Sequence, residues 1–384
     1  MTWTNPNISL IGAPGGRARL DTPALCVDLD ALERNIAIMA ARMKGRGVAL
    51  RPHCKTHKSV TIARMQVAAG AIGICCTTLG EAEIMVAGGL PGVHITSPQV
   101  TPSKIERLVA LAARAHLGLT VAVDDLSNLA VLAAAAAAAG IELGVLADYS
   151  AGHHRTGAAT EDDVLSLARA AAEATALRFR GVQSYSGHIQ HIAERAEQLE
   201  RARVRLSILG RLVAALRAEG IEVPIVTGSG TGTHEIDAAS GVFTEIQAGS
   251  YVFMDVDYHR AMAAGLNGPN FETALFVQTA VVSRNGAVIP GGYVTTDAGL
   301  KSFATEGPNP ELMSGGPAGA TYAFFGDEHG MLRFPQGAPV PALGDRVELM
   351  TPHCDPTVNL YDAYHVVRAD TLVEVWPVDA RGKR

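Results

Sequence analysis

Cysteine is scarce in this chain of 384 residues, and the few cysteines present exclude a disulfide framework. Their number is odd, and no two of them are spaced as C-x-x-C. A sparse set of this kind is typical of reduced thiols in a cytosol. We therefore expect no disulfide bonds and a cytoplasmic protein. The five positions are Cys26, Cys54, Cys75, Cys76 and Cys354.

Long apolar runs and an excess of positive charge are also lacking. Residues 1–6 have neither the charged nor the apolar region of a signal peptide, and the alanine-rich run at 129–139 is too short to span a bilayer. The formal net charge is −6, without a basic stripe, which argues against nucleic-acid and membrane-surface partners. These absences predict a soluble protein.

The sequence does contain enough apolar residues for a large core. They make up 48% of a chain longer than one typical domain, so a large barrel plus a smaller domain is expected. From residue 48 onward, short apolar runs alternate with helical periods such as 103–116, 126–139 and 195–219. Eight strand–helix repeats over about 200 residues are what a parallel (β/α)8 barrel of the TIM type requires, whereas an open doubly wound sheet usually needs fewer. The predicted strands are 48–51, 71–76, 93–96, 119–123, 143–147, 179–185, 225–227 and 244–247.

After about residue 254 glycine and proline become frequent, helical periodicity disappears, and β-rich pieces predict a second, mainly antiparallel β domain. The apolar segment 23–29 is a further strand candidate, with Asp30 as the N-cap of a following helix. A strand that precedes the barrel has no parallel partner of its own, so we expect it to join the second domain. The predicted domains are a barrel over 30–255 and a β domain built from 1–29 and 256–384. Its predicted strands after the barrel are 273–283, 293–296, 322–325, 346–350, 363–367 and 372–376.

An apolar strand that ends in a cluster of basic residues occupies 48–58 (VALRPHCKTHK). In parallel sheets ligand chemistry gathers where strands end, so Lys55 stands where a reactive lysine is expected. The barrel mouth would desolvate its amine, and Arg51, Lys58 and two histidines would crowd it, which favours the neutral form that makes a Schiff base. From this stretch alone, an ordinary basic loop is an equal alternative.

The glycine-rich segment VTGSGTG covers the end of the seventh predicted strand and the loop that follows this strand. Glycines let backbone N–H groups approach an anion closely, and the hydroxyls of Ser229 and Thr231 add donors; the loop after strand seven is a recurrent phosphate position in such barrels. No lysine follows, so the loop is not a P-loop, and its spacing is not the dinucleotide pattern G-x-G-x-x-G. A purely structural turn stays the alternative.

Two histidine-rich clusters also follow predicted strands, GHHRTG after the fifth and YSGHIQH after the sixth. Arg155 and Tyr185 in these clusters could hold the phenolate or ring nitrogen of an aromatic cofactor, while His191 could serve as a base. The alternative is that the histidines of the first cluster are loop surface residues. We favour that alternative for His153 and leave His154 open.

The segment PHCDPTVN in the second domain contains a candidate metal-binding pair. If the segment is extended, His353 and Asp355 point to the same face and Cys354 faces away. One nitrogen and one oxygen ligand suit a divalent ion, and two protein ligands leave positions open for substrate or water. The pair therefore predicts a catalytic rather than a structural metal.

Motifs along nearly the whole chain resemble, in the same order, those of the metal-activated, pyridoxal-phosphate D-threonine aldolases and the related D-3-hydroxyaspartate aldolases and D-serine dehydratases. The resemblance implies the alanine-racemase-like fold (fold type III), which agrees with the barrel and β domain predicted above. The motifs are RPHCKTHK at 51–58, GSGTG at 228–232, AGSYVFMD at 248–255, DAGLK at 297–301, DEHG at 327–330 and HCDPT at 353–357.

The resemblance also implies how the cofactor is held. Lys55 would form the Schiff base with pyridoxal 5'-phosphate, Arg155 would face its phenolate and Tyr185 its ring nitrogen. Tyr251 would help a glycine-rich cradle to bind the phosphate. The residues of that cradle are Gly228, Ser229, Gly230, Thr231 and Gly232.

The activity implied is retro-aldol cleavage of a D-β-hydroxy-α-amino acid, of the D-threonine or D-phenylserine type, to glycine and an aldehyde. His191 would be the base near the substrate hydroxyl. His353 and Asp355 would bind a divalent metal, Mn²⁺ or Mg²⁺ with Zn²⁺ as the other option, that holds the β-oxygen. The resemblance further implies a homodimer, because family members complete each site with the partner's β domain.

Three alternatives stay open at this point. A D-3-hydroxyaspartate aldolase would use the same residues. In a D-serine or hydroxyaspartate dehydratase, Lys55 would remove the Cα proton and ammonia would leave. Asp355 argues against a dehydratase, because the family's dehydratases tend to carry a cysteine at that position. The segment 77–80 (TTLG), in contrast, is more similar to the dehydratases. A non-catalytic pyridoxal-phosphate carrier would lack the second domain. Departures from the aldolase pattern at 77–80, 97–99 and 148–150 line the mouth and leave the substrate side chain and the role of Thr77 and Thr78 open.

Overall fold

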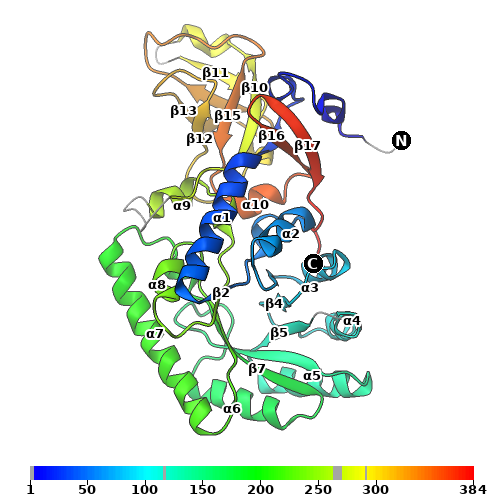
Figure 1. Cartoon of the computed structure of the whole chain (residues 1–384). Coiled ribbons are helices and arrows are strands. Elements are labelled where there is room, and N and C mark those ends of the chain that lie inside the picture. The colour runs from blue at the N-terminus through cyan, green and yellow to red at the C-terminus, as the bar shows by residue number, and fades with distance from the viewer. Residues whose placement is uncertain (1–3, 116–117, 263–269, 290–291) are drawn as a thin grey trace. The chain divides into compact units, whose positions relative to one another are not determined.

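The computed structural model describes residues 4–115, 118–262, 270–289 and 292–384. Within these residues the chain forms two compact units. The barrel unit holds 37–249 with the short pieces 261–262 and 382–384, and the sheet unit holds the other described residues. Figure 1 shows the elements of both units, coloured along the chain.

Eight short parallel strands form the core of the barrel unit, and they coincide with the eight predicted strands to within a few residues. Strands β3 to β8 pair in chain order, and β2 pairs with β9. Backbone hydrogen bonds close the ring, because Ile72 N–H donates to Leu50 O and Thr244 N–H donates to Val226 O. The first and last strands therefore meet at a seam, as a (β/α)8 barrel requires. The strands are β2 (Ala49–Leu50), β3 (Ile74–Cys76), β4 (Val93–Ile95), β5 (Leu119–Val123), β6 (Leu143–Asp148), β7 (Leu177–Ser184), β8 (Ile225–Gly228) and β9 (Glu245–Ile246).

In the described residues, seven α-helices follow the barrel strands, and five of them begin at a polar residue whose side chain accepts a hydrogen bond from a free backbone N–H group. Thr78 forms a capping box with Glu81, and Thr160 forms one with Asp163. The three predicted helices are present; the end of the one predicted at 103–116 lies partly outside the described residues, and its helix ends at Ala112. The helices are α2 (Val60–Ala68), α3 (Leu79–Ala87), α4 (Pro102–Ala112), α5 (Leu126–Ala138), α6 (Glu161–Glu173), α7 (Arg195–Ala218) and α8 (His234–Ala238).

Helix α1 (Leu29–Arg46) starts earlier than the sequence pattern indicated. The prediction that Asp30 is its N-cap is wrong. Asp28 satisfies a free N–H group of the first turn instead, since its Oδ1 accepts a hydrogen bond from Ala31 N–H at 3.0 Å. Asp30 lies inside the first turn, where a carboxylate is favoured by the positive end of the helix dipole.

The sheet unit is a mainly antiparallel sheet, as predicted, and the N-terminal strand belongs to it. Strand β1 pairs antiparallel with β10 and parallel with β16, so it does have one parallel partner, inside this sheet. The order is β13-β14-β11-β10-β1-β16-β17, with β15 paired to β10 and β12. The strands are β1 (Ala24–Asp28), β10 (Leu275–Ser283), β11 (Tyr293–Thr296), β12 (Glu311–Ser314), β13 (Thr321–Phe324), β14 (Gly330–Arg333), β15 (Arg346–Met350), β16 (Ala363–Arg368) and β17 (Thr371–Pro377).

Four short elements of the sheet unit were not predicted. Strand β12 is largely exposed and β14 begins at a glycine, so neither carries an apolar alternation that a sequence pattern can detect. Two short helices after residue 254, α9 (Val256–Ala261) and α10 (Cys354–Val358), were likewise not predicted. Helices of one or two turns are too short to show a period.

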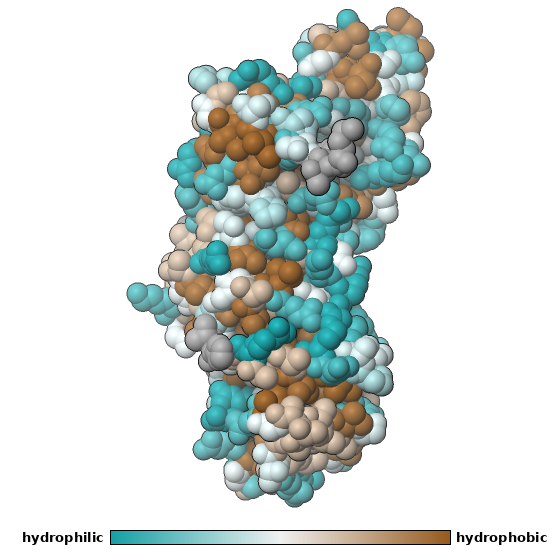
Figure 2. Space-filling view, turned by 90° about the vertical axis from the view of Figure 1, so that its right-hand side faces the viewer, coloured by the Kyte–Doolittle hydropathy of each residue, from teal (hydrophilic) through white to brown (hydrophobic). Residues whose placement is uncertain are grey.

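Apolar side chains also reach the surface of the described part of the chain. Leu126 and Val131 of α5 are exposed. Figure 2 shows, on one face, brown apolar patches separated by teal polar ones. Scattered apolar residues of this kind are normal on a protein surface. Of the described helices, none is long and apolar enough to cross a membrane.

A buried ion pair lies at the barrel seam. Arg51, directly after β2, donates from Nε and Nη2 to the two carboxylate oxygens of Glu245 in β9, at 2.8 Å each. The side chains are 10% and 4% exposed. Burial raises the pKa of Glu245, but the hydrogen bonds and charge of Arg51 outweigh burial and hold that pKa below its ordinary value. Arg51 N–H also donates to Ile246 O, so backbone and side chain close the same seam.

Removing one partner of this pair should destabilise the barrel. Glu245→Gln leaves the Arg51 charge buried without a counter-charge, a change that typically costs about 3–5 kcal/mol. We expect the free energy of unfolding, measured by urea denaturation, to fall by that order. Arg169→Met, which breaks an exposed pair with Glu219, is the matched control and should leave the free energy of unfolding nearly unchanged. A loss no larger than that of the control would contradict the role of the pair.

Candidate active site

Loops at one end of the barrel carry most of the residues predicted for the site. They follow β2, β6, β7 and β8, and the carboxyl ends of these parallel strands lie at the same end of the barrel. Tyr185 and Lys55 there are half-buried, whereas Arg155 and His191 are exposed. The predicted residues at this end are Lys55, Arg155, Tyr185, His191, Gly228, Ser229, Gly230, Thr231 and Gly232.

Lys55 lies in a 3₁₀ turn (Cys54–Thr56) just after β2. His53 begins this turn, and its Nδ1 accepts a hydrogen bond from Lys55 N–H at 3.3 Å. On the other side of the ring, His53 Nε2 lies 3.2 Å from Thr96 Oγ1 and 3.3 Å from Thr77 Oγ1. Polar contacts on both ring nitrogens therefore fix the imidazole that holds the turn of Lys55. This gives Thr77 a structural place beside the candidate site.

The prediction that Arg51 and Lys58 crowd Lys55 as free charges is wrong. Arg51 is paired with Glu245, and Lys58 Nζ donates to Glu81 Oε1 at 2.5 Å, with all four side chains buried. Each cation thus has its own carboxylate, so like charge does not single out Lys55. What distinguishes Lys55 is its half-buried place at the barrel mouth.

The loop after β8 has a backbone that only glycine permits at three positions. A Cβ on Gly228 would lie 2.0 Å from Ser184 O, and a Cβ on Gly232 would lie 2.0 Å from Gln190 O. On Gly230 it would lie 2.5 Å from Gln190 Oε1. These glycines therefore allow the loop to pack closely against Ser184 and Gln190. The donors that the loop offers, backbone N–H groups with the hydroxyls of Ser229 and Thr231, are of the kind that binds a phosphate, so the donor set fits the phosphate of the implied cofactor.

Side chains outside this loop hold its conformation through hydrogen bonds, and none of them was predicted to have a role. Gln190 Oε1 accepts from Gly232 N–H at 3.1 Å, and Gln190 Nε2 donates to Thr233 Oγ1 at 3.0 Å. Thr233 in turn donates to Asp237 Oδ2 at 2.6 Å. The other oxygen of Asp237 forms a buried ion pair with Arg205 of α7. Of these residues, only Gln190 could have been singled out from the sequence, because it stands in the YSGHIQH cluster.

Arg155 and Tyr185, predicted to share a cofactor, contact each other. Arg155 Cζ lies 5.7 Å from the centre of the Tyr185 ring, a cation–π distance. His153 meets the same ring edge-on at 6.4 Å and stacks on His188 at 5.8 Å, between ring centres. His153 thus lies in a loop, partly exposed and in contact with two rings, and its lack of a role in the site stays a prediction, whereas His154 is exposed. Burial and the charge of Arg155 lower the pKa of His153.

A chain of polar side chains crosses the barrel interior from β4 to β6. His94 Nε2 lies 2.9 Å from Gln183 Oε1, and Gln183 Nε2 donates to Asp148 Oδ1 at 3.0 Å. Thr156 Oγ1 donates to the other Asp148 oxygen at 3.2 Å. Burial lowers the pKa of His94 to about 4. Burial raises the pKa of Asp148 to about 6, although its two hydrogen bonds act in the opposite direction.

In the sheet unit, the segment with the predicted metal ligands is not extended, so that premise of the metal prediction is wrong. His353 has an extended backbone (φ −145°, ψ 127°), but it is the N-cap of α10 (Cys354–Val358), and Asp355 lies in the first helical turn. The turn is held by Asp255, whose Oδ2 accepts a hydrogen bond from Cys354 N–H at 2.9 Å. Strand geometry therefore cannot be what places the two side chains on one face.

The donors in this segment still suit a hard or borderline divalent ion. His353 Nδ1 lies 3.1 Å from Glu306 Oε1. Burial raises the pKa of Asp255 to about 6, while His353 acts to lower it and Asp355 to raise it. Across the described ranges, no three or more His, Cys, Asp or Glu side chains are arranged to hold a metal. The imidazole of His353 and the carboxylate of Asp355 are a donor pair that fits a metal whose other positions belong to substrate or water.

Tyr251, predicted to complete the phosphate cradle, also belongs to the sheet unit. It lies in a 3₁₀ turn (Ser250–Val252) and is fully buried. Its ring packs against Phe271, with ring centres 5.6 Å apart and a tilt of 50°. The aromatic contact fixes the position of the Tyr251 ring within this unit.

Two sequence families match this chain. Residues 27–257 match the family described as alanine racemase, N-terminal domain. Residues 274–367 match a family described as a serine dehydratase domain.

Individual proteins match nearly the whole length. The chain is 41% identical to a D-threonine aldolase of Arthrobacter sp over 95% of this chain and 94% of that protein. It is 38% identical to a 3-hydroxy-D-aspartate aldolase of Paracoccus denitrificans (strain Pd 1222), over 95% of this chain and 93% of that one. Among solved structures, a D-threonine aldolase from Filomicrobium marinum matches with a TM-score of 0.89 and 40% identity, over 95% and 96% of the two chains.

The buried Asp148 should make folding stability depend on pH. Its pKa of about 6 lies above the ordinary value of 3.8, so between about pH 4 and pH 6 the folded state keeps a proton that the unfolded state has released. Stability should therefore fall as pH rises through this window, by roughly 3 kcal/mol for a difference of this size. Urea denaturation across the window measures this fall.

Asp148→Asn, which resembles the protonated form, should remove that part of the pH dependence. Asp162→Asn changes an exposed residue and is the matched control, which should keep the wild-type slope. An unchanged slope in Asp148→Asn would show that other groups cause the dependence.

Proposed function

The chain belongs to the alanine racemase-like family that contains the D-threonine aldolases and 3-hydroxy-D-aspartate aldolases, and from this we propose that it is an aldolase dependent on pyridoxal phosphate and a divalent metal. Its substrate is a D-β-hydroxy-α-amino acid of the D-threonine or D-phenylserine type, cleaved between Cα and Cβ to glycine and an aldehyde. The observation that carries the proposal is 41% identity to a D-threonine aldolase over 95% of the chain.

The predicted family, the barrel with a second antiparallel domain, and the class of carbon–carbon lyase are confirmed. Family membership implies pyridoxal 5'-phosphate, which when bound supplies an electron sink for the pair left on Cα. The individual site residues are our proposal, supported by their positions in the fold. Lys55 would hold the cofactor covalently.

The cofactor's other contacts follow from the barrel loops. The glycine loop 228–232, together with Tyr251, would bind the phosphate. Arg155 would face the phenolate and Tyr185 the ring nitrogen. Their mutual contact at 5.7 Å supports a joint assignment, because the Tyr185 ring holds the guanidinium in one orientation.

Proton transfer requires a base near the substrate hydroxyl, and we assign that role to His191. His191 follows Gln190, whose side chain is tied to Gly232 N–H and Thr233 Oγ1, so its place in the chain is fixed next to the glycine loop. A neutral imidazole there would accept the hydroxyl proton as the Cα–Cβ bond breaks. The amine of Lys55 would then deliver a proton to Cα, which completes glycine.

His353 and Asp355 would hold the divalent metal, whose chemistry is to polarise the substrate hydroxyl so that its proton leaves readily. One imidazole nitrogen and one carboxylate oxygen favour Mn²⁺ or Mg²⁺, with Zn²⁺ also compatible. Glu306 Oε1 lies 3.1 Å from His353 Nδ1. A carboxylate at Nδ1 orients the ring so that Nε2 is the nitrogen directed to a metal.

A dehydratase that releases ammonia is the second candidate, because residues 274–367 match a serine dehydratase domain family. Two features favour the aldolase. The second metal position is Asp355 rather than a cysteine. The neighbouring thiol, Cys354, is fully buried, and burial raises its pKa, so it is poorly suited to be a thiolate ligand. Assaying glycine against ammonia from D-threonine, D-phenylserine, D-3-hydroxyaspartate and D-serine distinguishes the two.

We further propose a homodimer that acts in the cytoplasm on a small-molecule amino acid. The dimer is supported by the resemblance to family members that complete each site with the partner's β domain, and light scattering of the active enzyme tests it. The cytoplasmic compartment is supported by the five cysteines, all of which are free thiols, because a reducing environment keeps thiols free. Cell fractionation would locate it.

Lys55 should be the only lysine that attaches the cofactor. Borohydride treatment of the holoenzyme should fix the cofactor on Lys55, as peptide mass spectrometry can show. Lys55→Ala should lose the near-visible absorbance and reduce cleavage to background, because both attachment and proton return depend on that amine. A borohydride adduct on Lys58 or Lys301 instead would overturn the assignment.

Substitution of the metal ligands should separate cofactor binding from cleavage. His353→Ala and Asp355→Ala should keep the cofactor absorbance, since neither residue is assigned to the cofactor, and yet lose nearly all cleavage. Chelator should do the same to the wild type, and Mn²⁺ or Mg²⁺ should restore it. Asp370→Ala, in an exposed turn, is the matched control for Asp355→Ala. Full activity in metal-free enzyme would refute the metal's role.

A further inference from the structure

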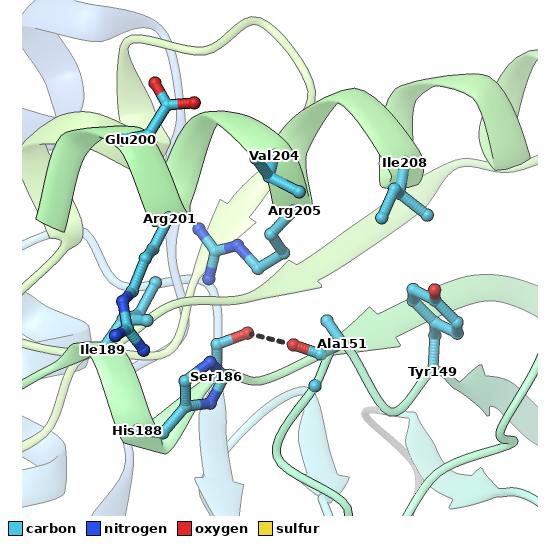
Figure 3. Close-up of a pocket in the computed structure, with 11 residues that line it drawn as sticks. Tyr149, Ala151, Ser186, His188, Ile189, Glu200, Arg201, Val204, Arg205 and Ile208 are labelled. Atoms are coloured by element: carbon cyan, nitrogen blue, oxygen red, sulfur yellow. Dashed lines mark hydrogen bonds between the residues drawn. The ribbon is translucent and has the colours of Figure 1, made fainter. Parts of the chain in front are cut away.

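A cavity of about 360 Å³ lies in the barrel unit, between helix α7 and the loops that follow β6 and β7. Its walls are largely apolar: Figure 3 shows Val204 and Ile208 of α7 facing Tyr149 across it, with Ile189 at the other end. The volume falls in the lower range of known small-molecule sites. Neither Lys55 nor any residue of the loop 228–232 lines the cavity, although Gly152, Ser186 and His188 belong to the same loops as Arg155 and Tyr185.

Arg205 supplies the cavity's buried polar group. It is only 4% exposed. Its Nη2 is paired with Asp237, but among the described residues its Nε and Nη1 donors have no hydrogen-bond partner. Buried guanidinium donors without an acceptor are rare in folded proteins. The Phe243 ring lies 5.5 Å from Arg205 Cζ and covers the guanidinium face, but it accepts no conventional hydrogen bond from these donors. These two nitrogens have almost no accessible surface, so an acceptor on a ligand in the cavity would satisfy them once the Arg205 side chain turns toward it.

The charges around Arg205 favour an anion. In Figure 3, Arg201 and Arg205 both project from α7 toward the loop of Ser186 and His188, whereas Glu200 points to the opposite side of the helix. Glu200 carries the only carboxylate among the described lining residues. Arg201 has an exposed partner, Glu197, at 2.7 Å. One end of the cavity therefore presents two guanidinium groups, whose carboxylate partners, Asp237 for Arg205 and Glu197 for Arg201, are not among the residues that line it.

We propose that this cavity binds a small carboxylate with an apolar body. The carboxylate would lie at the end formed by Arg205 and Arg201, because a planar guanidinium matches a planar carboxylate. The apolar body would pack against Tyr149, Val204 and Ile208. A highly charged phosphate compound fits less well, since most of the wall offers it no polar contact. The proposal does not depend on the aldolase activity.

Benzoate is the probe that matches this chemistry, and benzamide is its uncharged counterpart of the same shape. Titration calorimetry on the holoenzyme should show benzoate binding about tenfold or more tightly than benzamide, the size expected from a charge-assisted hydrogen bond. Arg205→Met should remove that preference. Because Arg205 also pairs with Asp237 behind the glycine loop, this variant also needs circular dichroism to confirm its fold.

The decisive variant therefore fills the cavity without touching Arg205. Val204 is 53% exposed at its rim, so Val204→Trp can place an indole in the cavity without repacking the core. It should weaken benzoate binding by about tenfold or more, because the apolar body loses its place. Val131→Trp on α5, at a site 52% exposed, is the matched control and should bind benzoate as the wild type does.

Three results would overturn the proposal. The first is no detectable binding of benzoate. The second is equal affinity for benzoate and benzamide. The third is equal benzoate affinity in Val204→Trp and Val131→Trp, which would place the benzoate elsewhere, for example at the catalytic end of the barrel. None of these results would bear on the aldolase assignment, which is tested by cleavage and by the borohydride adduct.

Discussion

Closure of the barrel at a single seam is the constraint on which the candidate site depends. Strands β2 and β9 share only two register pairs, so their backbone contribution is small. The bidentate pair of Arg51 and Glu245 adds two hydrogen bonds at the same place. Lys55 stands four residues after Arg51, and the glycine loop 228–232 precedes Glu245 along the chain. Any slip at the seam would therefore move Lys55 relative to the loop that is proposed to hold the phosphate.

The barrel could be predicted from sequence because its strands are buried on both faces and appear as continuous apolar runs. The sheet unit was predictable only where strands are long and apolar, as at β10 and β15. Strands β12 and β14 were missed because neighbouring strands, rather than their own composition, stabilise them. The cap of α1 was misplaced by two residues because Asp28 and Asp30 carry the same side chain, and only the backbone decides which one accepts the hydrogen bond.

The site residues at strand ends were predictable by rule, since parallel strands bring their carboxyl ends together. Their partners were not, because those lie far away in sequence: Glu245 is 194 residues from Arg51, and Asp237 is 32 residues from Arg205. For the same reason the expected crowding of Lys55 failed, as the sequence lists charges without showing which are paired. The assumption of an extended segment at His353 failed because Asp255, which holds the first turn of α10, is also remote in sequence.

Arg205 connects the support of the glycine loop 228–232 with the cavity beside α7. A glycine loop is intrinsically flexible, so a defined phosphate site requires that its conformation be fixed from outside. Gln190 and Thr233 do this, and Thr233 is oriented by Asp237, whose charge requires a buried cation. Apolar residues of similar size would fill the space of the ion pair at lower desolvation cost, but they could not accept the Thr233 hydrogen bond. The buried guanidinium behind the loop is thus explained by positioning, and its two remaining donors are the groups to which we assign the proposed carboxylate.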